Sequence, residues 1–141
     1  MSDTATPMQR MLAGELYRAD DEQIQSAQAD TRHWLARYNA ALTLAPAQRH
    51  ALLAERLGAA GGGCEIRPPF HCDYGFNIHL GCGVFLNFNC VILDVVAVEI
   101  GDGTQIGPAV QIYTADHPRD PALRRDGWEV GRAGRTGRNV W

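Results

Sequence analysis

The sequence lacks the features that mark several large classes of protein. Its 141 residues carry 13 basic and 16 acidic side chains, a net charge of −3, so there is no basic excess for nucleic acid or an anionic membrane. No apolar run approaches the roughly 20 residues of a membrane-spanning helix. The opening MSDTATPMQR has neither the basic nor the apolar region of a signal peptide. We therefore expect a cytoplasmic protein whose partners include neither nucleic acid nor a membrane.

Cysteine is scarce, and its spacing matches no common zinc or redox motif. There are four cysteines, and none forms a CxxC pair. We expect them to be free thiols, because a free cysteine in the cytoplasm behaves as a small buried hydrophobe. A zinc-dependent enzyme is a weaker hypothesis beside the two given below, because one stretch mixes metal-ligand residue types: His71, Cys72, Asp73, His79 and Cys82. In the six-residue repeat described below no single face gathers three of them, so we expect no metal site.

The first part of the chain, residues 7–60, has the pattern of a small helical segment. Thr6 precedes Pro7, a capping residue followed by proline at the first helical position. Asp20 or Asp21 is placed to cap a second helix. Apolar residues recur there at helical spacing and give one apolar face: Ile24, Ala27, Thr31, Trp34, Leu35 and Tyr38. Pro46 opens a third expected helix.

From residue 65 to residue 141 a different period takes over. Aliphatic residues repeat every six positions in two sets of three, separated by a two-residue insertion: Leu80, Leu86, Ile92, then Ile100, Ile106, Ile112. This is the period of a hexapeptide β-helix, in which three short strands make one coil. We expect these side chains in one interior, and residues 18 apart, such as Cys72 and Cys90, stacked on each other. Glycines directly after the leading aliphatic residues should supply unusual backbone angles at the corners.

Several stretches resemble one known family. They are MLAGELYRADD, PPFHCDYGFNIHLG, NFNCVILD, IGPAVQIYTADHP and GRNVW, which look like the maltose and galactoside O-acetyltransferases and the nodulation-factor acetyltransferases. The resemblance extends from about residue 7 to residue 141. It implies a mainly β fold, a left-handed parallel β-helix preceded by the helical segment. It also implies a homotrimer that binds acetyl-CoA in a groove between neighbouring β-helices, with the sugar acceptor near the thioester.

The resemblance implies a catalytic role for His117, in YTADHP. This residue matches the family histidine that acts as general base on the acceptor hydroxyl, which then attacks the thioester directly. An imidazole is largely neutral at pH 7 and accepts a proton. Pro118 limits the freedom of the loop, and Asp116 or Asp120 is a candidate to orient the ring. The alternative for His117 is a surface loop histidine.

Other positions match family contacts to the acceptor or to acetyl-CoA. Asn87 matches an asparagine near the acceptor and the reacting centre, and Asp73 matches a polar acceptor contact. Asp20 or Asp21 falls near an acidic acceptor contact, and a carboxylate suits sugar hydroxyls because it accepts hydrogen bonds without donating. Trp141 matches a position close to the cofactor groove. The alternative for Asn87 is a corner side chain that bonds its own backbone, and Asp73 has a structural alternative as well.

Two hypotheses about function follow. The first is an enzyme that transfers acetyl from acetyl-CoA to a sugar hydroxyl. The second is a catalytically impaired relative that at most self-associates or binds sugar. In the family, further hexapeptides follow a stretch like GRNVW and build much of the cofactor groove, so we expect a C-terminally truncated chain with an incomplete β-helix. Thiol release from acetyl-CoA, with and without a sugar, separates the two hypotheses.

Overall fold

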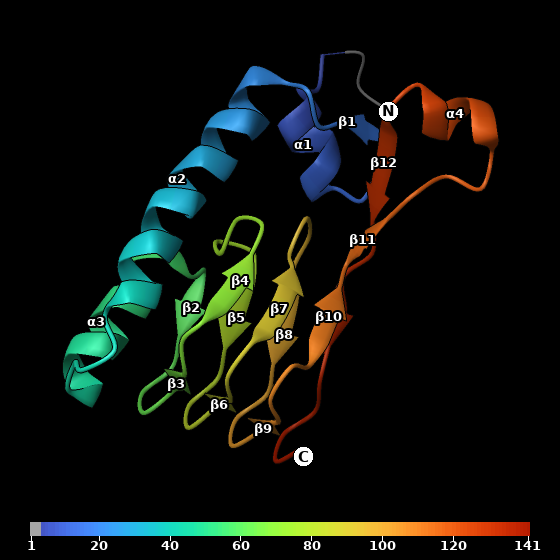
Figure 1. The fold of residues 1–141 in the computed structure, drawn as a ribbon. Coiled ribbons are helices and arrows are strands. Elements are labelled where there is room, and N and C mark those ends of the chain that lie inside the picture. The colour runs from blue at the N-terminus through green and yellow to red at the C-terminus, as the bar shows by residue number, and fades with distance from the viewer. Residues whose placement is uncertain (1–3) are drawn as a thin grey trace.

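The computed structural model describes residues 4–141 and begins with a helical segment (Figure 1). This segment contains α1 (Pro7–Leu12), α2 (Glu22–Ala40) and α3 (Pro46–Arg56). Thr6 caps α1 through a hydrogen bond to its Oγ1 from the Gln9 N–H at 3.1 Å. Asp21 caps α2 in the same way, accepting from the Ile24 N–H at 3.2 Å. The three predicted helices are confirmed, and none of those described is long and apolar enough to cross a membrane.

The chain then winds through short strands that form three parallel sheets. The first sheet contains β2 (Ala59–Ala60), β5 (Ile78–Leu80), β8 (Val98–Ile100) and β13 (Gly134–Arg135). The second contains β3 (Glu65–Ile66), β6 (Phe85–Leu86) and β9 (Gln105–Ile106), and the third β4 (Phe70–Cys72), β7 (Cys90–Leu93) and β10 (Gln111–Tyr113). Successive strands belong to different sheets, so each coil has three sides. The molecule is a parallel β-helix with small helices at its start, as the six-residue period predicts.

The aliphatic residues of the repeat line the interior of the coils. Leu80, Leu86, Ile92 and Ile100 are at most 3% exposed, and Ile106 and Ile112 pack against the same core. Fully burying such a side chain contributes about 1.5–3 kcal/mol. The helices add Trp34, Tyr38 and Leu53 to this core. Figure 1 shows α2 and α3 beside β2, β3 and β4, so the helical segment covers the first coil.

Residues stacked in neighbouring coils are 20 apart, not 18. Cys72 pairs with Ile92, and Phe70 pairs with Cys90. The stack of Cys72 on Cys90 predicted from sequence was therefore wrong. The eight-residue step from Ile92 to Ile100 recurs from Cys72 to Leu80, across the corner between β4 and β5. Each coil is thus two residues longer than three hexapeptides.

The glycines of the repeat serve two different purposes. A Cβ on Gly81, directly after Leu80, would lie 2.2 Å from Asp102 Oδ1 in the next coil. The left-handed backbone occurs two residues later, at Gly83 and Gly103, with φ of 65° and 70°. The expectation that the first glycine supplies the unusual backbone angle was wrong. A side chain is excluded there by the close approach of the next coil.

Between β10 and β13 the chain leaves the coils and returns. This excursion contains β11 (Ala115–Asp116), α4 (Pro121–Arg125) and β12 (Trp128–Gly131). β12 lies between β11 and β1 (Tyr17–Arg18), antiparallel to both. Figure 1 shows this small sheet beside α1, beyond the ends of the coil strands. The sheet therefore joins the N-terminal segment to the loop that carries His117.

Candidate active site

His117 lies in the loop between β11 and α4, and it is exposed. Its backbone N–H donates to Asp116 Oδ1 at 2.8 Å, and its carbonyl oxygen accepts from Arg119 Nη1 at 2.9 Å. The backbone is therefore held on both sides of the residue. The imidazole remains accessible to a substrate, as a general base requires.

Neither neighbouring aspartate orients the imidazole. The Asp116 carboxylate accepts from the backbone of His117 and from Arg119 at 3.0 and 3.4 Å, and these donors lower its pKa. Asp120 Oδ1 accepts from the Ala122 N–H at 2.7 Å and caps α4. Both carboxylates therefore shape the loop backbone, and neither is hydrogen-bonded to the imidazole in this structure.

Asp73 lies at the corner after β4, close to Glu129 of β12. Burial, and then the negative charge of Glu129, raises the pKa of the Asp73 carboxyl to about 6. Glu129 Oε2 accepts a hydrogen bond from the Tyr17 hydroxyl at 3.0 Å, and Tyr17 pairs directly with Glu129 across β1 and β12. Sequence reasoning missed Glu129 and Tyr17, because residues so far apart in the chain give no local signal of contact.

Asp94 holds the corner on which Asp73 sits. Its Oδ1 accepts from the N–H groups of Asp73 at 3.1 Å and Tyr74 at 3.0 Å, and its Oδ2 accepts from Gly75 at 2.8 Å. Asp94 is fully buried, and burial raises its pKa to about 7 although the backbone donors oppose this shift. The next coil therefore fixes the position of Asp73. This residue too was missed from sequence.

The two N-terminal acidic candidates lie on different surfaces. Asp20 forms an exposed ion pair with Arg18 at 2.8 Å. Asp21, the cap of α2, lines an open groove of about 790 Å³ beneath that helix. No hydrogen bond of Asp20 or Asp21 reaches His117 within the described part of the chain. An acceptor role for Asp20 stays a prediction.

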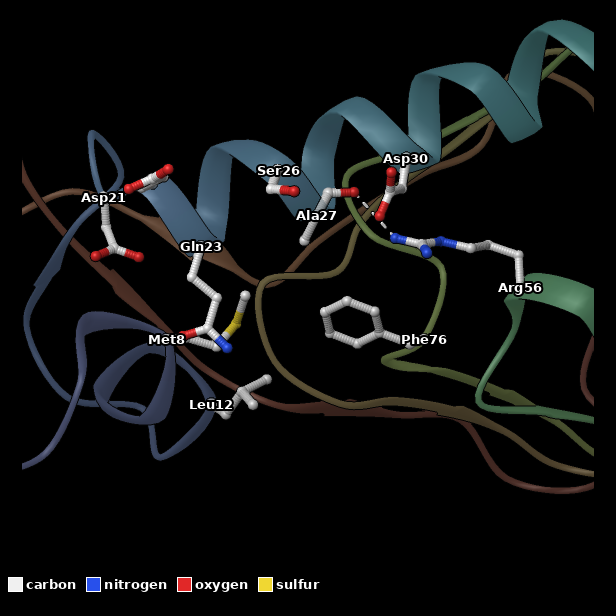
Figure 2. Close-up of a pocket in the computed structure, with 10 residues that line it drawn as sticks. Met8, Leu12, Asp21, Gln23, Ser26, Ala27, Asp30, Arg56 and Phe76 are labelled. Carbon is white, nitrogen blue, oxygen red and sulfur yellow. Dashed lines mark hydrogen bonds between the residues drawn. The ribbon is translucent and has the colours of Figure 1, made fainter.

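The groove beneath α2 has a structural arginine at one end (Figure 2). Arg56 Nε donates to the Tyr74 carbonyl at 2.6 Å, and Nη2 donates to the Ala27 carbonyl at 3.0 Å and to Thr31 Oγ1 at 2.7 Å. Its guanidinium also lies over the ring of Phe76, 5.4 Å from the centroid. These contacts join α3 to α2 and to the corner after β4, so Arg56 holds the helical segment on the first coil.

Asn87 and Trp141 lie near the corner between the second and third sheets, whereas His117 lies beyond the other edge of the third sheet. Asn87 precedes β7, and its Oδ1 accepts from the Phe88 N–H at 2.8 Å, which is the structural alternative considered from sequence. Trp141 is 98% exposed and follows Val140, whose carbonyl accepts from Gln105 of β9. His117 instead follows β10, which runs parallel to β7. One chain therefore does not bring Asn87 and His117 together.

Comparison with known proteins decides the family. Residues 10–61 match the maltose acetyltransferase hexapeptide capping motif. The chain is 57% identical over 138 residues to nodulation protein L of Rhizobium leguminosarum bv. viciae, covering 98% of this chain and 73% of that protein. A maltose O-acetyltransferase structure from Clostridium difficile 630 has a TM-score of 0.89 at 32% identity, covering 97% of this chain and 80% of that one.

The chain belongs to the maltose and galactoside O-acetyltransferase family. This hexapeptide acetyltransferase is also 32% identical to a galactoside O-acetyltransferase of Lactococcus lactis, over 94% of this chain and 64% of the relative. A hexapeptide-repeat acetyltransferase from Vibrio cholerae, complexed with acetyl coenzyme A, has a TM-score of 0.79 at 28% identity, covering 96% of this chain and 79% of that one. The family predicted from the sequence motifs is confirmed.

The acetyltransferase shows no cluster that could hold a metal ion among residues 4–141. Cys72 pairs with Ile92 inside the coil, where burial raises the pKa of its thiol. His71, on the same strand, is exposed. Neighbouring residues of a strand point to opposite faces, so these two side chains cannot share one ion. His71 and Cys72 therefore do not form a shared metal site.

Proposed function

We propose that this acetyltransferase moves acetyl from acetyl-CoA to the hydroxyl of a sugar, with His117 as general base. The observation that carries the proposal is the exposed imidazole in a loop whose backbone is held by Asp116 and Arg119. The Vibrio relative complexed with acetyl coenzyme A supports the donor. Relatives named maltose and galactoside O-acetyltransferases support a sugar acceptor. These relatives favour the enzyme over the non-catalytic hypothesis.

The chemistry needs one proton carrier. The neutral imidazole of His117 takes the proton of the acceptor hydroxyl while the oxygen attacks the thioester carbonyl carbon. The tetrahedral intermediate collapses, the carbon–sulfur bond breaks, and the imidazolium returns its proton to the departing thiolate. Asp73 accepts a hydrogen bond from a second sugar hydroxyl and so fixes the acceptor beside the base. No covalent enzyme intermediate is required.

We propose that two copies of the chain complete each site within a homotrimer of left-handed β-helices. Asn87 and Trp141 reach the site, and the acetyl-CoA groove, only from a neighbouring subunit, because they lie at the other edge of the third sheet from His117. The face of β4, β7 and β10 and its edge expose Phe88 (46%) and Tyr113 (56%), which a neighbour would bury. Residues 7–60 then cap the β-helix that residues 65–141 form, and the enzyme acts in the cytoplasm.

The test is sugar-dependent release of thiol from acetyl-CoA. Purified chain is incubated with acetyl-CoA alone and with maltose, a galactoside or an amino sugar, and the acetylated sugar is identified by mass spectrometry. We expect thiol release to rise with at least one sugar and to match the ester formed. Release that does not depend on any sugar hydroxyl would contradict the proposed acceptor class.

A further inference from the structure

The small antiparallel sheet aligns three side chains from distant parts of the chain. β11 pairs with β12 so that Ala115 lies opposite Gly131 and Asp116 opposite Val130. Continued by one residue, this register sets His117 opposite Glu129. On the other side of β12, Glu129 lies opposite Tyr17. Directly opposed residues of antiparallel strands project to the same side, with Cβ atoms about 4.5–5.5 Å apart. Glu129 is thus the middle member of a row from Tyr17 to His117.

The Glu129 carboxylate is anchored at one oxygen. Tyr17, which is 1% exposed, donates its hydroxyl to Glu129 Oε2 at 3.0 Å. Within residues 4–141, Tyr17 is the hydrogen-bond partner of this carboxylate, and Glu129 forms no ion pair. Among the described residues no hydrogen bond engages the second oxygen of Glu129. Asp73 is the other acidic group beside Glu129, as the electrostatic effect on its carboxyl indicates.

We propose that Glu129 is the positioning residue for His117, an inference that rests on the proposed function. One ring N–H of His117 donates to Glu129, which leaves the other nitrogen unprotonated and directed at the acceptor hydroxyl. When the imidazole takes the proton, the carboxylate offsets the new positive charge. Tyr17 keeps the carboxylate in place from the opposite side.

The geometry also explains why a more obvious residue does not have this role. Asp116 and Asp120 are closer in sequence, but their oxygens accept from Arg119 and from the backbone of the loop. The His117 ring and Glu129 are not in ion-pair contact in this structure, and His117 is exposed. A rotation of the His117 side chain is sufficient to bring its ring to the Glu129 carboxylate, because cross-strand neighbours are within reach of each other.

The experiment compares Glu129→Gln and Glu129→Asp in the full-length chain, with Glu55→Gln as the matched control. Glu55 is an exposed carboxylate that pairs with Arg37 at 2.9 Å, away from β12. Two quantities are measured: kcat and KM across pH, and the ¹⁵N resonances of the His117 imidazole, assigned by their loss in His117→Ala. Circular dichroism and thermal melting check that each variant folds.

We expect Glu129→Gln to lower kcat by less than the roughly 10²- to 10⁴-fold that the base itself supplies, with little change in KM for acetyl-CoA, and Glu129→Asp to recover part of the loss. The tautomer of the His117 imidazole should change in Glu129→Gln, because a carboxylate that accepts from one ring N–H determines which nitrogen carries the proton. An unchanged tautomer of His117 in folded Glu129→Gln would overturn the inference whatever the rates. If the parent chain transfers no acetyl, the proposed function fails, while the resonances still decide the Glu129–His117 contact.

Discussion

Asp94 of one coil accepts a hydrogen bond from the backbone N–H of Asp73 in the preceding coil, at 3.1 Å. The same carboxylate binds two further N–H groups, those of Tyr74 and Gly75. A fully buried side chain thus builds the corner that carries a proposed acceptor contact. Asp94 serves the stability of the fold, whereas Asp73 is proposed to bind the acceptor. We therefore expect mutation of Asp94 to lower the stability of the folded chain and mutation of Asp73 to raise it.

Asp94→Ala should strongly destabilise the protein. It leaves three backbone donors without their partner, and each unsatisfied buried group costs about 1–3 kcal/mol. We expect a loss of about 3 kcal/mol or more in the free energy of unfolding, measured by urea denaturation. Asp94→Asn is the matched variant: its amide oxygen still accepts from Asp73 and Tyr74, and only the Gly75 N–H loses its acceptor, so it should lose less than Asp94→Ala. Equal stability of Asp94→Ala and the parent chain would contradict the role of Asp94.

Asp73→Asn should stabilise the folded chain at pH 8. The pKa of Asp73 is raised to about 6 by burial and Glu129, so the folded state binds more protons than the unfolded state between about pH 4 and pH 6. Stability linked to this group is therefore present at low pH and is lost as pH rises through this window. The variant should melt a few degrees higher at pH 8, with a smaller difference at pH 4. A larger gain at pH 4 than at pH 8 would contradict this sign.

His117→Ala should lower acetyl transfer about 10²- to 10⁴-fold, because the general base is lost. The melting temperature should change little, since His117 is exposed in a loop. His33→Ala, which removes an exposed histidine from α2, is the matched control and should retain the parent rate. The parent rate should also fall as pH drops and the base becomes protonated. Equal thiol release by His117→Ala and the parent chain would show that another group is the base.

Asn87→Ala should lower activity less than His117→Ala, because Asn87 positions or polarises the substrate and carries no proton. The same thiol assay measures both rates.

His117 and Asn87 are each proposed to act from a different subunit, so trimers that mix the two variants should contain some intact sites. With random assembly of equal amounts, about a quarter of the interfaces combine a native His117 with a native Asn87. Coexpression and affinity isolation of mixed oligomers, followed by the thiol assay, measure this recovery. Activity of mixed oligomers no higher than the average of the separate variants would contradict a site shared between subunits.

The sequence by itself determined the class of fold and the residues of its interior. The six-residue spacing of Leu80, Leu86, Ile92 and their later counterparts is a local property of the chain, because it reflects which side chains each coil turns inward. The starts of the three helices likewise depend on contacts between residues a few positions apart, at Thr6, Asp21 and Pro46. The motifs around His117 and Asn87 were sufficient to predict the family.

Only the tertiary structure decided the register of the coils and the surroundings of His117. The offset of 20 residues depends on how the long corners at 73–77 and 94–97 stack, which Asp94 determines from the next coil. Tyr17 meets Glu129 across 112 residues because β1 pairs with β12. Asp116 and Asp120, by contrast, bind groups only one to three residues away along the chain. Spacing along a chain reports which residues share a face, whereas contacts between distant strands depend on how the whole fold closes.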